Sequence, residues 1–257
     1  AGARKVIMVA RDKNKLDKSL KYISDVLVNG GYIIEDNISD RILTIIGDIS
    51  DISAVKNIFY QLEKQNEKVD ICINNAGIAT ITNVFDIDEN NNFNSEKVNN
   101  INNNDINFIN QINTNLIGTW FVIRNCARHM RSHNIAGSII NITSINGSNK
   151  PSKNMAGYCA SKAGVIQITR SIVKELAEYN IRINNIDPGF HKTPMVSFAA
   201  SNPIIKKELE QIIPLGFIPD PKELIGSILM LSCNSASRNI TGSTITIDGG
   251  LSWRGEY

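Results

Sequence analysis

The sequence predicts an α/β fold built on a doubly wound parallel sheet. Short apolar runs alternate with stretches in which apolar residues recur at helical spacing, and this alternation continues along the chain. Strands that alternate with helices form right-handed βαβ units and a parallel sheet. The length of 257 residues suits one such domain, so we expect a single domain over residues 1–257.

The N-terminal part of the chain alternates strand and helix. The apolar run 6–10 predicts a strand, and the apolar residues that recur from Leu16 to Leu27 predict a helix, which Gly30 and Gly31 end. The run 42–46 predicts the next strand. Residues 55–62 then repeat apolar side chains at helical spacing, with Ser53 as the N-cap, and the run 69–73 predicts the third strand.

The C-terminal part continues the same alternation. Apolar spacing predicts helices around residues 116–130, from about 157 to 178 and near 221–232. The apolar runs between and after them predict strands at 138–142, 181–186 and 243–247. Because ligands bind outside the carboxyl ends of such strands, residues that follow the strands are the candidates for a functional site.

One segment departs from this pattern, because 13 of the 26 residues from Asn90 to Asn115 are asparagine. Few of these side chains can contribute to a packed core, so we interpret residues 88–112, approximately, as a low-complexity insertion in a surface connection. It reflects either compositional drift or a loop that binds a partner or substrate.

Composition excludes several classes of protein. A formal charge of +2, with both signs scattered, gives no basic stripe, so we expect no nucleic-acid partner. No run of 18 apolar residues occurs, so we expect no membrane partner. The four cysteines are far apart, which fits a reducing compartment. We expect a cytoplasmic protein, with an organelle left open because a leader could be missing.

Tyr158 and Lys162 form a Y-x-x-x-K pair within a predicted helix. A four-residue step places the phenol and the ammonium on one face, one turn apart, where the cation can favour ionisation of the phenol. Such a pair can donate a proton to a carbonyl. On its own it is also typical of a packed ring beside a solvated charge.

Further motifs stand at the ends of predicted strands: Asn74-Asn75-Ala76-Gly77 after the third strand, Ser144 after the fourth, Pro188-Gly189 with Thr193 after the fifth and Asp248-Gly249-Gly250 after the last. Asn115 lies in Asn-Thr-Asn-Leu-Ile-Gly, just before a predicted helix. Together these motifs resemble the short-chain dehydrogenase/reductase family over nearly the whole chain. The resemblance implies a Rossmann-like fold and an oxidoreductase similar to 3-oxoacyl-carrier-protein reductases and to sugar or polyol reductases.

The resemblance also implies a glycine-rich turn, T-G-x-x-x-G-x-G, for the cofactor pyrophosphate, and the 257 residues contain no such turn. We therefore interpret the fold as N-terminally incomplete, lacking a βα unit of roughly 30 residues. In the family's strand order, 3-2-1-4-5-6-7, this leaves two strands with unpaired edges. A non-catalytic or truncated family member, acting as an oligomeric scaffold or binding module, is the alternative.

The family assigns roles to four residues of the site. Tyr158 is the acid/base, Lys162 lowers its pKa and binds the nicotinamide ribose, Ser144 donates to the substrate oxygen, and Asn115 holds a water of the proton relay. Ser144 could instead be a turn cap, and Asn115 one more residue of the asparagine-rich segment. The expected substrate is a small carbonyl compound or secondary alcohol.

The resemblance also assigns cofactor contacts. Alanine stands where the family places an acid for the ribose 2′-hydroxyl, and Arg11 follows it, which favours the 2′-phosphate of NADP(H) over NAD. Asp48 corresponds to the contact with the adenine, or caps a helix. The remaining cofactor contacts are Asn75, Ala76, Gly77, Tyr158, Lys162, Pro188, Gly189 and Thr193.

Two further expectations concern metals and assembly. His129 and His133 have the four-residue spacing of helical metal ligands, but the sequence offers no third ligand near them, so we expect no metal site. In the family, the helices that carry Asn115 and Tyr158 pair across a two-fold axis, which implies a homodimer or homotetramer.

Overall fold

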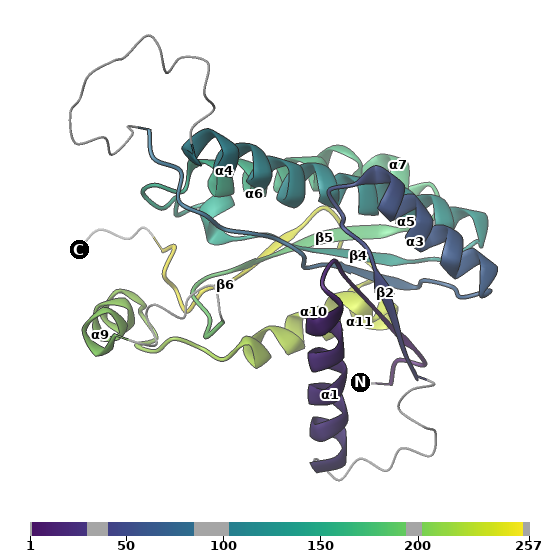
Figure 1. The fold of residues 1–257 in the computed structure, drawn as a ribbon, viewed down its shortest axis with the longest axis horizontal. Coiled ribbons are helices and arrows are strands. Elements are labelled where there is room, and N and C mark those ends of the chain that lie inside the picture. The colour runs from purple at the N-terminus through teal and green to yellow at the C-terminus, as the bar shows by residue number, and fades with distance from the viewer. Residues whose placement is uncertain (1, 30–40, 85–102, 194–201, 254–257) are drawn as a thin grey trace. The chain divides into compact units, whose positions relative to one another are not determined.

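The structure is a computed structural model that describes residues 2–29, 41–84, 103–193 and 202–253. It divides into two compact units, residues 1–67 and residues 68–257 (Figure 1). Each unit contains parallel strands connected by helices, so the predicted α/β fold is confirmed.

The first unit is a βαβα arrangement. Its strands pair in parallel, with Val6 opposite Ile42 and Ala10 opposite Ile46. The chain runs through β1 (Val6–Ala10), α1 (Lys13–Asn29), β2 (Ile42–Ile46) and α3 (Ile52–Lys64). Gly30 and Gly31 lie outside the described residues. The buried apolar side chains of this unit are those of Leu16, Ile45, Val55, Ile58 and Leu62.

The N-cap of α3 differs from the prediction, which was Ser53. Asp51 is the N-cap, and its carboxylate accepts a hydrogen bond of 2.8 Å from the main-chain N–H of Ser53. Ser53 therefore lies inside the first turn, where its N–H is one of the groups that a cap must satisfy.

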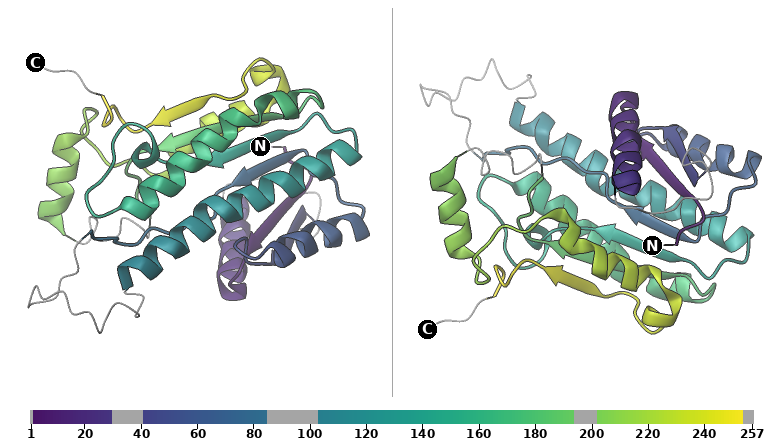
Figure 2. Two further views of the ribbon diagram at one scale, coloured as in Figure 1. Left: turned by 90° about the horizontal axis from the view of Figure 1, so that it is seen from above. Right: turned by 90° about the horizontal axis from the view of Figure 1, so that it is seen from below.

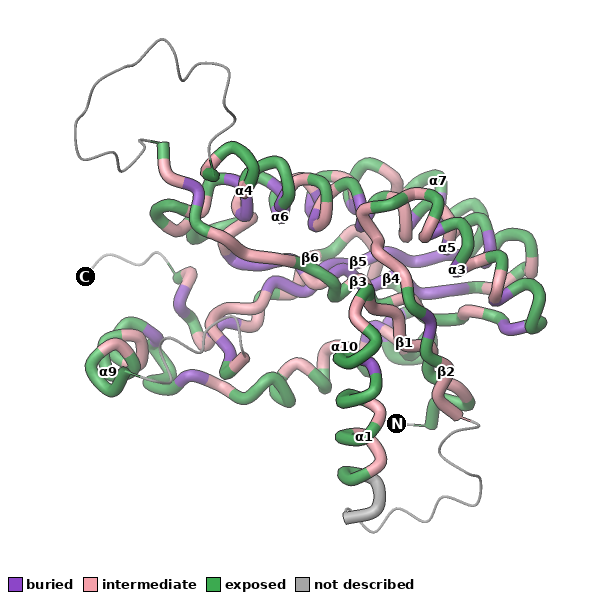
Figure 3. Tube along the Cα trace, viewed as in Figure 1, coloured by how far each residue is buried: buried purple, intermediate pink, exposed green. Residues whose placement is uncertain are grey.

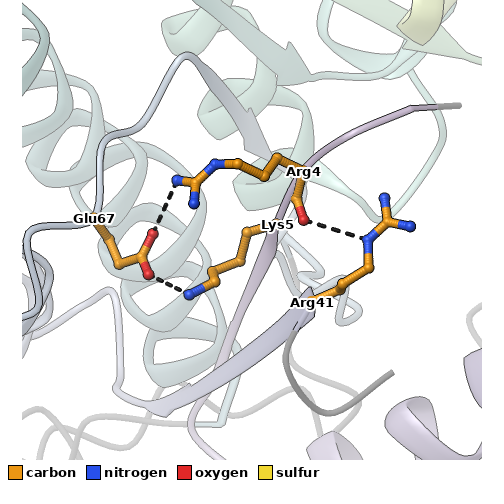
Figure 4. Close-up of polar contacts among 4 residues, drawn as sticks. All are labelled: Arg4, Lys5, Arg41 and Glu67. Atoms are coloured by element: carbon orange, nitrogen blue, oxygen red, sulfur yellow. Dashed lines mark hydrogen bonds and ion pairs between the residues drawn. The ribbon is translucent and has the colours of Figure 1, made fainter. Parts of the chain in front are cut away.

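Charged residues connect the start of β1 to the residues that follow α3 (Figure 4). Glu67 accepts hydrogen bonds from Lys5 and, at 3.4 Å, from Arg4. Arg41 donates from Nε to the main-chain oxygen of Arg4 at 3.4 Å. The Lys5 hydrogen bond lowers the pKa of Glu67 below its usual value, so the carboxylate stays ionised.

The second unit contains a four-stranded parallel sheet in the order β3-β4-β5-β6. Ile140 and Ile186, at its centre, are fully buried, and burial is concentrated along β4 and β5 (Figure 3). The strands are β3 (Ile71–Asn74), β4 (Ser138–Ile142), β5 (Arg182–Pro188) and β6 (Thr244–Ile247).

Helices cover both faces of this sheet (Figures 1 and 2). On one face lie α4 (Asn103–Gln111), the π-helix η2 (Ile112–Gly118), α5 (Thr119–Ser132), α6 (Ala156–Ser171) and α7 (Val173–Ala177). The opposite face carries α10 (Ile225–Ser232), which contacts β4 and β5, and α11 (Asn234–Ser237). The 3-10 helices are η3 (Ile145–Gly147) and η5 (Pro221–Leu224), and α9 spans Pro203–Ile212.

A row of polar side chains crosses the sheet in register. Asn74 stands opposite Asn141, Asn141 opposite Asn185, and Asn185 opposite Thr244. Asn74 donates to Asn141 at 2.8 Å, and Asn185 donates to Thr244 at 3.2 Å. Thr169 of α6 accepts from Asn141 and donates to Asn185, which joins the row to the helix. Because each buried polar group has a partner, this row, here called the amide row, favours one strand register.

The helices differ from the prediction in two places. The helix predicted from about 157 to 178 is interrupted at Ile172, between α6 and α7, and Asn180 then adopts a left-handed conformation (φ 57°) that ends it. Residues 103–111, assigned by sequence to the insertion, form α4, in which Gln111 is fully buried. The rest of that segment, 85–102, lies outside the described residues.

Four strands pair on one side only among the described residues. They are β1 and β2, which pair with each other, and β3 and β6, the outer strands of the four-stranded sheet. Ile71 and Ile73 of β3 are 41% and 45% exposed. The described helices include none that is both long and apolar enough to cross a bilayer.

Candidate active site

Tyr158 and Lys162 lie on the first two turns of α6 and face the sheet. The Lys162 Nζ atom is 5.7 Å from the centroid of the Tyr158 ring, as the four-residue spacing predicts. Tyr158 is 9% exposed and Lys162 is 6% exposed, so neither is a solvated surface residue. The ammonium donates a hydrogen bond of 2.8 Å to the main-chain oxygen of Ile142, at the end of β4.

Ser144 follows β4 and lies beside the phenol. It caps η3, since its hydroxyl oxygen accepts from the N–H of Asn146 at 3.2 Å, and its side chain is also hydrogen-bonded to Tyr158. The turn-cap interpretation is therefore correct. The same Ser144 hydroxyl is also a hydrogen-bond partner of the Tyr158 phenol.

Gly147 brings η3 against the helix that carries Tyr158. A Cβ atom at Gly147 would lie 2.6 Å from the main-chain nitrogen of Ala163 and 2.7 Å from Lys162 Cβ. Only glycine permits this approach, which sets the distance between the Ser144 segment and α6.

Asn115 lies in η2, where the helix widens to a π-turn, a feature that often marks functional sites. Its Oδ1 accepts from the N–H of Ile78 at 2.8 Å, and its Nδ2 donates to the oxygen of Ile78 at 2.8 Å and to Ser161 at 3.1 Å. Asn115 is fully buried, unlike a residue of a solvated low-complexity stretch. It fixes the segment that follows β3 against α6.

The electrostatics differ from the predicted effect of Lys162 on the phenol. Burial raises the pKa of Tyr158 above its usual value, the hydrogen bond with Ser144 offsets part of this effect, and the Asp187 carboxylate adds to it. Burial also lowers the pKa of Lys162 to about 8, against a smaller opposing effect of Asp187. Burial is therefore the largest influence on the Tyr158 pKa, and it keeps the phenol protonated.

Asp187 belongs to this site and was missed by sequence reasoning. It is fully buried at the end of β5, and its carboxylate accepts from the Thr143 hydroxyl. A carboxylate between the end of a predicted strand and a Pro-Gly turn, in Ile-Asp-Pro-Gly, is the pattern that could have revealed it.

The predicted cofactor residues of the second unit lie after the strands. Asn75, Ala76 and Gly77 are exposed. A Cβ at Gly77 would lie 3.2 Å from Asn115 Oδ1 and 3.5 Å from Lys162 Nζ, so this segment passes close to two of the four predicted catalytic residues.

Pro188, Gly189 and Thr193 are half-buried. Gly189 donates to the oxygen of Ile247 at 2.9 Å, and Thr193 donates its N–H to the oxygen of His191 at 2.7 Å. The turn after β5 is therefore held by the main chain on both sides of Phe190.

Arg11 and Asp48 belong to the first unit. They form an ion pair of 3.6 Å, with side chains that are 63% and 35% exposed, so the pair adds little stability. Asp48 is not a helix cap; it accepts from the N–H and the hydroxyl of Ser50. Partial burial opposes ionisation, but the Ser50 hydrogen bonds and the Arg11 charge together lower the pKa of Asp48.

Comparisons with known proteins agree with this geometry. A family model described as enoyl-(acyl carrier protein) reductase matches residues 33–252. The 3-oxoacyl-(acyl-carrier-protein) reductase of Chlamydia pneumoniae is 32% identical over 206 residues, which are 80% of this chain and 75% of that protein. The chain belongs to the short-chain dehydrogenase/reductase family. The family predicted from the motifs is thereby confirmed.

Two further short-chain dehydrogenases/reductases resemble the chain. The ribulose-forming D-arabinitol 2-dehydrogenase of Candida tropicalis is 40% identical over 139 residues, 53% of this chain and 49% of that protein. The chain thus spans about half the length of that relative. A gluconate 5-dehydrogenase of Burkholderia cenocepacia J2315, solved with NADP and tartrate, has a TM-score of 0.77 at 23% identity and covers 97% of this chain and 86% of its own. That likeness shows the fold alone.

Proposed function

We propose that this protein is an oxidoreductase that transfers a hydride between NADP(H) and a carbonyl compound or secondary alcohol, with Tyr158 as the acid/base. One observation carries the proposal: the buried Tyr158 phenol lies between the Ser144 hydroxyl, to which it is hydrogen-bonded, and the Lys162 ammonium, 5.7 Å from its ring centroid. Because the Ser144 hydroxyl and the Tyr158 phenol are adjacent, both can donate hydrogen bonds to a single carbonyl oxygen.

The chemistry of reduction fits these groups. NADPH, when bound, supplies the hydride that adds to the carbonyl carbon. Ser144 and Tyr158 donate hydrogen bonds to the oxygen as its negative charge grows, and Tyr158 then transfers its proton. Because burial raises the pKa of Tyr158, the phenol is protonated near neutral pH, as an acid must be. Lys162 stabilises the phenolate that remains.

Proton return to Tyr158 requires a relay. Asn115 is proposed to hold a water of this relay. Both hydrogens of its Nδ2 already have protein acceptors, Ile78 and Ser161. A relay water would therefore be held by an oxygen of Asn115.

The residues present suit the nicotinamide half of the cofactor. Lys162 uses one donor on Ile142, which leaves two N–H groups for ribose hydroxyls. Pro188, Gly189 and Thr193 would bracket the nicotinamide, and Asn75, Ala76 and Gly77 would pass the adenine ribose.

For the adenosine half, the candidate residues belong to the first unit. Arg11 carries a largely exposed guanidinium that could bind a 2′-phosphate, and Asp48 would contact the adenine. The glycine-rich turn for the pyrophosphate is not among the 257 residues.

Substrate class, assembly and location complete the proposal. The D-arabinitol 2-dehydrogenase and the 3-oxoacyl-(acyl-carrier-protein) reductase suggest ketoses and β-ketoacyl thioesters as test substrates. A groove of about 350 Å³ lined by Leu116, Ile117, Trp120, Ile168, Ser171 and Ile172 supports pairing of α5 and α6 with a second copy. The cytoplasmic location is proposed because four cysteines that are far apart in the sequence fit a reducing compartment.

Cofactor binding is the first test. NADPH fluorescence should change on addition of the protein, more strongly than for NADH, and Arg11→Ala should reduce the preference. NADPH oxidation should then follow with D-ribulose or an acetoacetyl thioester. Absence of NADPH binding by the folded protein would contradict the proposal and favour a non-catalytic scaffold.

A further inference from the structure

A buried carboxylate, that of Asp187 at the end of β5, lies near the predicted catalytic residues Tyr158 and Lys162. Asp187 is 0% exposed, and one of its oxygens, Oδ2, has no hydrogen-bond partner among the described residues. Burial of an incompletely paired carboxylate is unfavourable for folding, so its presence calls for a compensating role.

The hydrogen-bond donors near Asp187 lie on the segment that carries Ser144. The carboxylate accepts a hydrogen bond from the Thr143 hydroxyl. Burial raises the pKa of Asp187, and the Thr143 hydroxyl, the Ser148 hydroxyl and the main-chain N–H of Ser144 oppose this effect as donors. Three donors from residues 143–148 thus converge on one side chain of β5. This arrangement fixes the turn between β4 and η3, and with it the position of the Ser144 hydroxyl.

The Thr143 hydroxyl allows this contact in either charge state of Asp187. Thr143 has one hydroxyl proton and two neighbours, the oxygen of Ile186 at 2.8 Å and the Asp187 carboxylate. An ionised Asp187 accepts a hydrogen bond from that hydroxyl. A protonated Asp187 can donate to Thr143 while Thr143 donates to Ile186, so the segment stays in place when the charge changes.

Asp187 also acts electrostatically on α6. Its negative charge raises the pKa of both Lys162 and Tyr158. Ionisable groups near it among the described residues include Cys159 on α6 and His191 after β5, whose Nδ1 is 3.1 Å from the oxygen of Gly189. Asp248 is another, and its oxygens accept from the N–H groups of Gly250 and Ser252. Residues 143–148 contain no ionisable side chain.

We propose that Asp187 is a positioning residue of the active site: its buried carboxylate holds the segment that carries Ser144 and provides the counter-charge that keeps Lys162 an ammonium. The catalytic meaning of this role rests on the proposed function. The charge effect itself does not depend on turnover.

The test compares Asp187→Asn with Asn184→Ala. Asn184 is equally buried on the same strand but on the opposite face, where it contacts Ile240 and Ser243. Lysine labelled with ¹³C at Cε is followed by nuclear magnetic resonance, with Lys162→Met to assign the signal. In the parent, Lys162 should titrate near its pKa of about 8.

Loss of the carboxylate should lower the Lys162 midpoint by about one pH unit, and the control should leave it unchanged. The pH profile of carbonyl reduction should move to lower pH by the same amount, while the Kd for NADPH changes less than about twofold. Asp187→Ala, which also loses the acceptor for residues 143–148, should have a lower kcat than Asp187→Asn.

A Lys162 midpoint that is the same in the folded parent, Asp187→Asn and Asp187→Ala would overturn the proposal. If Asp187→Asn does not fold, Asp187→Ala gives the decisive titration. A parent without reductase activity would refute the proposed function, and the titration would still decide the role of Asp187.

Discussion

Gly147 gives the sharpest steric test of the site. Gly147→Ala places a methyl group 2.6 Å from the main chain of Ala163 and Lys162, whereas ordinary van der Waals contact begins at 3.4 Å. Main-chain atoms of a helix cannot rotate away, so η3 must move from α6 by about 0.8 Å, the difference between these distances. Ser144, three residues earlier, moves with η3 relative to Tyr158.

Two effects should follow from this displacement. Overpacking of this kind lowers the free energy of unfolding by about 1–3 kcal/mol. Misplacement of a catalytic group by about 1 Å lowers the rate by about 100-fold, so kcat should fall while the Kd for NADPH changes little.

Gly226→Ala is the matched control, because a Cβ there meets no atom within 4 Å. Its position in α10 predicts a gain of about 0.5–1 kcal/mol. Urea unfolding and steady-state kinetics on both variants give the two quantities. If Gly147→Ala matches the parent in stability and kcat, the packing of η3 against α6 described here is wrong.

The remaining predictions concern charge, assembly and the sheet. Burial lowers the pKa of Lys162 to about 8. Lys162 is therefore fully protonated well below that pH and loses its proton as the pH rises through it, so kcat/KM for reduction should fall above pH 8. Lys162→Arg, whose guanidinium remains charged, should move that fall to higher pH; an unchanged profile would exclude Lys162 as its cause. Trp120→Asp, in the groove on α5 and α6, should convert an oligomer to monomers in light scattering, whereas unchanged mass would place the interface elsewhere. Asn141→Leu removes the acceptor of the Asn74 amide nitrogen and the N–H groups that Asn141 donates to Thr169 and Asn185. It should lower the free energy of unfolding by about 2 kcal/mol, and parent-like urea stability would show that the amide row contributes nothing.

Local patterns were enough to predict most of the fold. The run 6–10 coincides with β1, 42–46 with β2 and 138–142 with β4, because apolar runs between turn residues have few alternatives to a buried strand. Helix ends were harder to predict. Ile172 interrupts a helix that its apolar neighbours predict to continue, and Asp51 rather than Ser53 caps α3, since only the main-chain geometry decides between two good caps.

The site was predictable where the residues are close in sequence. Tyr158 and Lys162 share a helix face because of their spacing alone. Asn115, by contrast, contacts Ile78, 37 residues away, and the donor to Asp187 is Thr143, which follows a different strand. Contacts of this kind depend on packing, as does the pKa of Tyr158, which burial raises.

The central claim is that the Tyr158 phenol gives its proton to a carbonyl oxygen. Its most direct test is the rate of NADPH oxidation with a carbonyl substrate by the parent and by Tyr158→Phe, with NADPH binding measured on both. The phenylalanine variant lacks only the hydroxyl, so it should bind NADPH within about twofold of the parent and lose at least about 100-fold in kcat. Ketone reduction at the parental rate by Tyr158→Phe would contradict the assignment of the acid.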